Sequence, residues 1–317
     1  MVLGTESAAA LGRECVALLW FLGVYLIVLA FVPMLTWLRT GRAVAVVVAS
    51  LLAAAAAVDG VRFAVGTPES GLANYVIVWL IPVVVGVAYA RRLIDPRAAI
   101  AAAAIAFATQ VGLAVAGTYE VSLVVTGVER MSNVSPPTLL VALQCTWMSC
   151  VFVAAAGAIR SWAARPRVWY VVAVGNGGAM TLYLWHIPAI AVATFALHAV
   201  GLDAYDVDAP GFWGILAVVM ALAFRLLSPL ENRRLPWWDA PVYAAGGRST
   251  AAGVLVCVAG VALLLLAKNG LSGFAGWTGL GFFVAAVMAA RVSAGKRSLG
   301  KAVASNSRER AATGVTH

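Results

Sequence analysis

The sequence predicts an all-α membrane protein, a polytopic bundle of about nine transmembrane helices. Its 317 residues are 63% hydrophobic and only 11% charged, and the mean hydropathy is +0.94. Soluble proteins carry about 25% charged residues, so this composition excludes an ordinary soluble domain. Apolar runs that reach the roughly 20 residues needed to cross a bilayer recur along the chain. We therefore predict one membrane domain over residues 1–292 and a basic, disordered cytoplasmic tail over residues 293–317.

Nine apolar runs are long enough to be spanning helices. They cover approximately residues 15–38, 43–64, 72–90, 98–117, 138–159, 179–202, 212–227, 251–267 and 274–291. Lys and Arg collect in the cytoplasmic loops of membrane proteins. With the N-terminus outside and one crossing per run, most of the 22 basic residues fall inside and most of the 13 acidic residues fall outside. The pattern predicts an outside N-terminus and an inside C-terminus. It attributes the net charge of +9 to topology and not to nucleic-acid binding.

The stretch 180–189 holds the residues best suited to chemistry. A histidine at membrane depth is costly to bury and usually faces a bundle interior or a wet cavity, which makes His186 a candidate site residue. Tyr183 lies three residues earlier and therefore shares its helix face. Pro188 has no N–H and frees the carbonyl of Leu184. The structural alternative is a kinked helix with a hydrogen-bonded histidine.

The backbone before this stretch carries a second prediction. The apolar residues from Trp169 to Leu202 would form a helix of roughly 50 Å, against a hydrocarbon core of about 30 Å. Residues 175–178 read Gly-Asn-Gly-Gly. Glycine-rich runs weaken helices, so we predict a break here, with a short interfacial piece before it and a spanning helix after it.

A few polar residues near the predicted outer surface are further candidates for a role in structure or binding. Asp59 and Arg62 are three residues apart, which favours an interfacial salt bridge; the alternative is a polar lining to an outward cavity. The loop from Thr118 to Pro137 is long, and long loops often bind ligands or act as lids. The four cysteines form no Cys-x-x-Cys pair and have no nearby histidine at ligand spacing, so the sequence predicts neither a disulfide nor a metal site.

Three motifs carry a family resemblance. Residues 181–188 read Thr-Leu-Tyr-Leu-Trp-His-Ile-Pro, residues 19–26 read Leu-Trp-Phe-Leu-Gly-Val-Tyr-Leu with Pro33 behind them, and residues 133–138 read Asn-Val-Ser-Pro-Pro-Thr. The first resembles the Tyr-Leu-Trp-His-x-Pro signature of the acyltransferase 3 family, a family of multi-pass membrane O-acyltransferases. All three motifs together resemble its actinobacterial branch, and they follow one another in the family's order.

The resemblance implies a function. Members move an acyl group from an acyl-CoA-like donor to a hydroxyl of a cell-envelope carbohydrate or glycolipid, in the cell membrane. On this basis His186 is the candidate catalytic residue, and Tyr183, Trp185, Asn133 and Ser135 are candidate substrate-binding residues. Histidine suits proton transfer because its pKa lies near neutrality. The expected partners are membrane lipid, the acyl donor and the acceptor, with no nucleic acid, bound cofactor or metal.

One family motif does not occur in this sequence. Family members carry an Arg or Lys eleven positions before a His in the first helix. Here Gly175 precedes His186 by eleven positions, and Ile187 precedes His198. The chain therefore resembles the family without its N-terminal motif-bearing helices. Either an upstream start restores them, or this chain is a non-catalytic fragment, or a non-catalytic partner of another acyltransferase that supplies them. A lipid or small-solute transporter is the third alternative.

Overall fold

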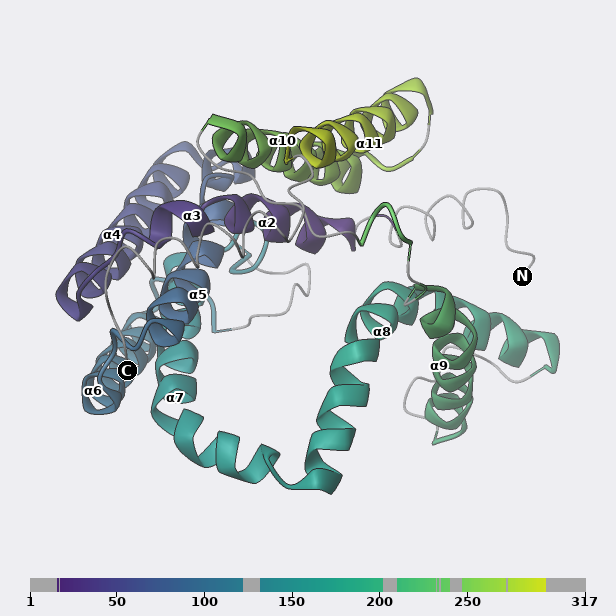
Figure 1. Ribbon diagram of the computed structural model, residues 1–317, viewed down its shortest axis with the longest axis horizontal. Helices are drawn as coiled ribbons and strands as arrows, with labels where there is room; N and C mark the ends of the chain where they lie inside the picture. Colours follow the sequence, from purple (N-terminus) through teal and green to yellow (C-terminus); the bar gives the residue numbers. More distant parts are fainter. Residues whose placement is uncertain are drawn as a thin grey trace, which may run out of the picture. The chain divides into compact units, whose positions relative to one another are not determined.

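The computed structural model describes residues 16, 18–121, 132–201, 210–231, 233, 235–239, 247–271 and 273–294 (Figure 1). Over these ranges the regular structure is helical, which confirms the all-α class. Eight helices in this part of the chain are long and apolar enough to span a membrane. The elements are α2 (Leu19–Ala30), α3 (Val32–Leu35), α4 (Gly41–Val65), the 3-10 turn η1 (Pro68–Gly71), α5 (Asn74–Ala90), α6 (Pro96–Val115), α7 (Leu139–Ala163), α8 (Pro166–Ala199), α9 (Pro210–Glu231), α10 (Gly247–Asn269) and α11 (Gly273–Ala294).

The first predicted span, residues 15–38, is interrupted in the structure. Helix α2 covers only 12 residues, and the four-residue helix α3 follows it. Pro33 lies in the first turn of α3, where its missing N–H is tolerated. Continued α2 would place the proline ring against the carbonyl of Leu29, so the helix ends at Ala30.

The chain divides into two compact units. The central unit comprises Phe21–Asn176, and the terminal unit comprises Met1–Trp20 with Gly177–His317. In the central unit, α4 packs on α5, and α5 and α6 both pack on α7. Its core includes Ala55 of α4, Val78 and Ile81 of α5, and Val141 and Ala142 of α7. Small side chains among these let the helices approach closely, as is common in membrane bundles.

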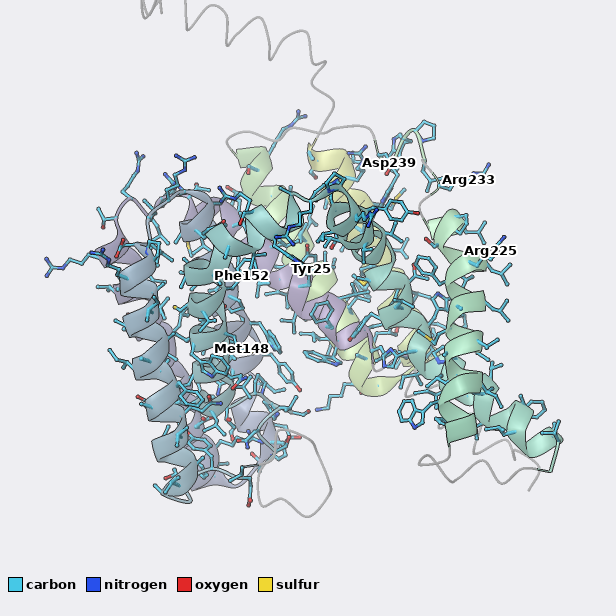
Figure 2. The ribbon with its side chains drawn as sticks, turned by 90° about the horizontal axis from the view of Figure 1, so that it is seen from below. Tyr25, Met148, Phe152, Arg225, Arg233 and Asp239 are labelled. Atoms are coloured by element: carbon cyan, nitrogen blue, oxygen red, sulfur yellow. The ribbon has the colours of Figure 1, made fainter. Side chains whose placement is uncertain are left out.

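Much of the helix surface is apolar and exposed. Met148 and Phe152 lie one turn apart on α7 and are both more than half exposed (Figure 2). A soluble protein would bury such side chains, whereas a membrane protein can turn them toward lipid. This surface agrees with the membrane class that the composition predicted.

Local sequence signals define the ends of the central helices. Thr40 caps α4 by accepting a hydrogen bond from the N–H of Ala43, and Asp95 caps α6 in the same manner. Helix α4 ends at Gly66, whose φ of 75° is a left-handed conformation that glycine adopts readily. The chain then turns through η1, which connects the C-terminal end of α4 to the N-terminal end of α5.

The predicted break at residues 175–178 is wrong. Helix α8 is continuous over 34 residues from Pro166 to Ala199. Each glycine costs about 1 kcal/mol relative to alanine within a helix. The long helical segments on both sides stabilise α8 enough to offset this cost. Gly178 instead allows close packing, because a Cβ there would overlap the ring of Phe224 on α9. Helices α10 and α11 pack on one another in the terminal unit.

Candidate functional site

A buried carboxylate organises one end of the central unit. Asp59, near the end of α4, is fully buried. Its Oδ1 accepts a hydrogen bond from Asn74 Nδ2 at 2.9 Å. Its Oδ2 accepts from the Tyr119 hydroxyl at 2.9 Å and from the backbone N–H of Leu139 at 2.7 Å. A buried charge is costly unless it is hydrogen-bonded, and here one side chain joins four segments of the chain.

Arg62 lies one helical turn after Asp59 and is also buried. Its Nη1 donates to the carbonyl of Pro136 at 3.1 Å, and its Nη2 donates to the carbonyl of Ser132 at 3.2 Å. Asp59 and Arg62 therefore hydrogen-bond to separate partners and not to each other as the sequence favoured. The Asp59 charge still acts electrostatically on the Arg62 guanidinium. Arg62 fastens the segment before α7 to the end of α4.

The segment from Ser132 to Thr138 is held by its own side chains as well. Asn133 is buried, and its Nδ2 donates to the carbonyl of Glu120 at 2.7 Å. Thr138 donates from Oγ1 to Asn133 Oδ1 at 3.0 Å. The Ser132 hydroxyl accepts from the N–H groups of Val134 and Ser135. The predicted binding residue Asn133 thus positions the segment from within.

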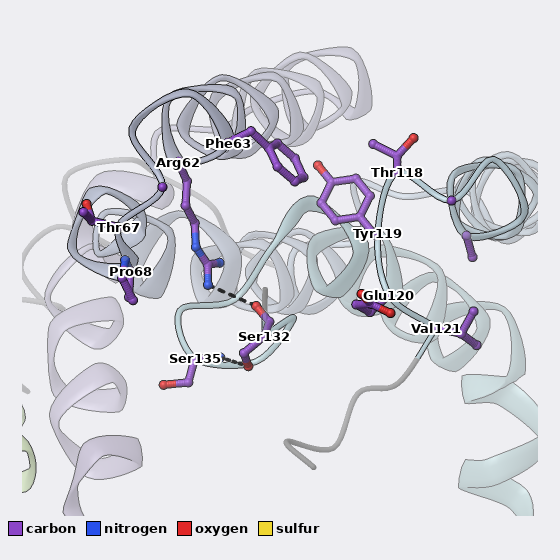
Figure 3. Close-up of a pocket in the computed structure, with 13 residues that line it drawn as sticks. Arg62, Phe63, Thr67, Pro68, Thr118, Tyr119, Glu120, Val121, Ser132 and Ser135 are labelled. Carbon is purple, nitrogen blue, oxygen red and sulfur yellow. Dashed lines mark hydrogen bonds between the residues drawn. The ribbon is translucent and has the colours of Figure 1, made fainter. Parts of the chain in front are cut away.

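Arg62 and Ser132 of this network border a cavity of about 640 Å³ (Figure 3). Arg62 and Phe63 reach it from α4, Tyr119 from the turn after α6, and Ser135 from the segment before α7. Phe63 and Tyr119 meet edge to face with ring centroids 5.6 Å apart. Burial, together with the neighbouring Asp59 charge, raises the pKa of the Tyr119 phenol well above its usual range. The other lining residues are Gly66, Thr67, Pro68, Ala114, Gly117, Thr118, Glu120, Val121 and Ser132.

Ser135 is the exposed member of the predicted binding pair. It lines the cavity, and its Oγ lies 2.9 Å from the Tyr75 hydroxyl. The sequence left two roles open for Arg62, a salt bridge with Asp59 or a polar lining to a cavity. Its position in the structure is that of a lining residue. Sequence reasoning missed Tyr119 and Glu120, which follow α6 directly. Their place at the start of a long loop was the only local signal.

His186 and Tyr183 lie together on α8 in the terminal unit. Their ring centroids are 5.8 Å apart, which confirms the shared helix face. His186 Nδ1 lies 2.5 Å from the carbonyl oxygen of Tyr183. A carbonyl oxygen can only accept, so Nδ1 carries a proton in this contact, and in the neutral tautomer that makes it Nε2 keeps its lone pair. The Tyr183 hydroxyl donates to the carbonyl of Leu18 at 3.0 Å, and Trp185 is 37% exposed.

The five predicted site residues therefore form two groups. Tyr183, Trp185 and His186 belong to α8 of the terminal unit, whereas Asn133 and Ser135 belong to the central unit. A second cavity of about 670 Å³ in the central unit is bordered mainly by apolar side chains of α4, α6 and α7. Within the described ranges, no group of three or more His, Cys, Asp or Glu residues could hold a metal ion.

A comparison with known families gives one match. The family model described as an acyltransferase domain, Acyl_transf_3, matches residues 6–228, which is more than half of the chain. The matched range includes both the cavity residues of the central unit and the Tyr183–His186 pair. Searches of curated proteins and of solved structures returned no match.

Proposed function

Because this multi-pass membrane protein belongs to the acyltransferase 3 family, we propose that it transfers an acyl group from an acyl-CoA-like donor to a hydroxyl of a cell-envelope carbohydrate or glycolipid. The family match supports acyl transfer in general. The donor and acceptor classes, the plasma or inner membrane as the location, and the roles of individual residues are parts of the proposal. The observation that carries the catalytic part is the hydrogen-bonded histidine of α8.

His186 acts as general base and acid in this proposal. Its Nδ1–H is held by the Tyr183 carbonyl, which orients the ring and leaves Nε2 to accept a proton. The acceptor hydroxyl gives its proton to Nε2 as its oxygen attacks the thioester carbonyl carbon. A C–O bond forms, the C–S bond then breaks, and the proton passes from Nε2 to the departing thiolate. No group is oxidised or reduced, and the histidine returns to its starting state.

The neighbouring aromatic residues contact the substrate. Tyr183 is half-buried beside His186, and its hydroxyl donates to the backbone at Leu18, so its ring edge is fixed. Trp185 is partly exposed on the same helix. We assign Ser135 to direct contact with the acceptor because it borders a cavity, and Asn133 to holding the same segment in place.

The test uses the full chain in native-like membranes, a radiolabelled acyl-CoA series and an isolated envelope fraction as acceptor. His186→Gln removes the titratable nitrogen and keeps a similar size. General acid–base catalysis contributes about 10²–10⁴-fold, so label transfer should fall by about that factor at equal protein level. His198→Gln, on the same helix, is the matched control and should leave transfer within about threefold of wild type, or roughly 0.7 kcal/mol. Transfer that survives His186→Gln at the control's level removes the residue from the mechanism.

A second candidate function is that of a non-catalytic partner. The observation that favours it is the absence from this sequence of an Arg or Lys eleven positions before either His186 or His198. In that case the purified chain transfers no label alone, and activity appears when it is co-expressed with another acyltransferase chain. Transfer by the chain purified alone would exclude this candidate.

A further inference from the structure

The cavity of the central unit has the size and chemistry of a small-molecule site. Its volume of about 640 Å³ lies within the roughly 300–1,000 Å³ typical of ligand pockets. Hydroxyl groups come from Thr67, Thr118, Ser132 and Ser135, and each can both donate and accept a hydrogen bond. Two aromatic side chains, two charged ones and five residues without a polar side chain, Gly66, Pro68, Ala114, Gly117 and Val121, complete the lining. The surface therefore offers many polar contacts next to an apolar face.

The described charged groups at the cavity are one cation and two carboxylates. Among the described residues that line it, Arg62 and Glu120 are the charged ones. The buried carboxylate of Asp59, which is not one of the lining residues, acts electrostatically on the Arg62 guanidinium. Two guanidinium nitrogens already donate to backbone carbonyls. A cation matched by two carboxylates does not attract a further anion, so the site favours an uncharged ligand with many hydroxyl groups.

The aromatic side chains of the cavity add an apolar surface that suits the C–H face of a sugar ring. Phe63 is 49% exposed although it borders a polar cavity, and its ring is fixed against Tyr119 by an edge-to-face contact. The electron-rich face of an aromatic ring attracts C–H groups. A sugar ring presents C–H groups on one face and hydroxyls around its edge, so it can use Phe63 and the hydroxyl-bearing rim together.

The position of the cavity agrees with an extracytoplasmic ligand. Its lining comes from the C-terminal ends of α4 and α6 and from the segment before α7. Arg42 and Arg97 begin α4 and α6 at their other ends, and Arg91 and Arg92 follow α5 there. Basic loops mark the cytoplasmic side, so the cavity faces the opposite side.

We propose that this cavity binds an uncharged sugar ring of the acceptor, through Glu120 and the surrounding hydroxyls at its edge and through Phe63 at its face, and that it selects against uronate and phosphorylated sugars. The role of that sugar as acceptor rests on the proposed function. The binding preference itself depends only on the cavity.

Direct binding tests this without any acyl donor. The full chain is placed in lipid nanodiscs, since maltoside detergents would compete. Ligand-observed NMR then measures the methyl glycosides of glucose, galactose, mannose, arabinose and N-acetylglucosamine, with methyl glucuronide and glucose 6-phosphate as charged counterparts. At least one neutral glycoside should bind with a Kd in the mM range or tighter, and at least about tenfold more tightly than the charged sugars.

Two variants place the bound sugar in the cavity. Glu120→Gln loses charge-assisted acceptance, and Phe63→Leu loses the ring; each should weaken neutral-glycoside binding by about tenfold. Asp95→Asn, at the opposite end of α6, is the control and should leave binding unchanged. Equal or tighter binding of the charged sugars would overturn the proposal, as would variants without effect or no neutral binding up to about 100 mM. The binding test measures no turnover, so its result stands even if the acyl-transfer test fails. Failure of the binding test likewise leaves the acyl-transfer result unaffected.

Discussion

Loss of the Asp59 carboxylate should destabilise the central unit more than loss of an exposed one. Asp59→Ala removes the acceptor of three donors: Asn74 Nδ2, the Tyr119 hydroxyl and the Leu139 N–H. Asn74 Nδ2 keeps the carbonyl of Ala55 at 3.4 Å, so two donors are left unsatisfied. Each unsatisfied group costs about 1–3 kcal/mol, so the variant should lose about 2–6 kcal/mol of unfolding free energy. At about 2 °C per kcal/mol, Tm should fall by roughly 4–12 °C.

Asp59→Asn should be much milder, for a reason visible in the geometry. The amide oxygen can still accept from Tyr119 and Leu139 at the Oδ2 position. Its NH₂ group can donate to Oδ1 of Asn74, which is buried and has no hydrogen-bond partner in the native arrangement. Rotation of the Asn74 amide brings that oxygen into place. The remaining loss is that of charge assistance, about 1–3 kcal/mol.

The assay is thermal unfolding of the full chain in one detergent or nanodisc preparation. Asp95→Ala is the matched control, because Asp95 is exposed and caps α6 through two backbone N–H groups. Loss of an N-cap costs about 1 kcal/mol, or roughly 2 °C. The reasoning is refuted if Asp59→Ala lowers Tm no more than Asp95→Ala, or if Asp59→Asn is as damaging as Asp59→Ala.

Three further predictions concern other contacts. The pKa of Tyr119 is raised in the folded state, so the folded protein keeps this proton above about pH 10, where an unfolded tyrosine loses it. The Tm of wild type should therefore exceed that of Tyr119→Phe by its full amount below about pH 10, and this difference should shrink as the pH rises to about 11. A difference that grows with pH would contradict this. Gly178→Ala should lower the stability of the terminal unit by about 1–3 kcal/mol through overlap with Phe224, and Phe224→Leu should restore it in thermal unfolding; an equal loss in the double variant would rule out that overlap. Gln110→Leu removes the 2.8 Å bond from Gln110 Nε2 to Gln144 Oε1 between α6 and α7 and should cost about 1 kcal/mol in denaturant unfolding. Trp147 Nε1 donates to both glutamine oxygens, so it keeps one acceptor in this variant and loses both when Gln144→Leu is added. The double variant should therefore be less stable than the single one, and equal stability would place the cost elsewhere.

Features that depend on neighbouring residues could be predicted from the sequence. Composition and the length of the apolar runs determined the membrane class, because a bilayer sets a minimum span. The proximity of Tyr183 and His186 followed from their spacing on a helix. Resemblance in three short motifs identified the family to which the matched range 6–228 belongs.

Features that depend on distant contacts could not be predicted. Glycines at residues 175–178 suggested a break, yet helix α8 continues, because packing against Phe224 uses Gly178 and the local cost of glycine is small. Asp59 and Arg62 suggested a pair by their spacing, but the available donors and acceptors lay elsewhere in the chain.

The cavity shows this limit most clearly. The buried carboxylate of Asp59 takes hydrogen bonds from Tyr119, which lines the cavity 60 positions away, and from Leu139, 80 positions away. Uniformly apolar helices do not mark in sequence which face meets which neighbour, since lipid and protein interior are both apolar. The sequence by itself therefore determined the class of the protein, most of its spans and one local pair of side chains. Tertiary packing alone decided which polar residues meet, because only packing brings together helix ends that are far apart along the chain.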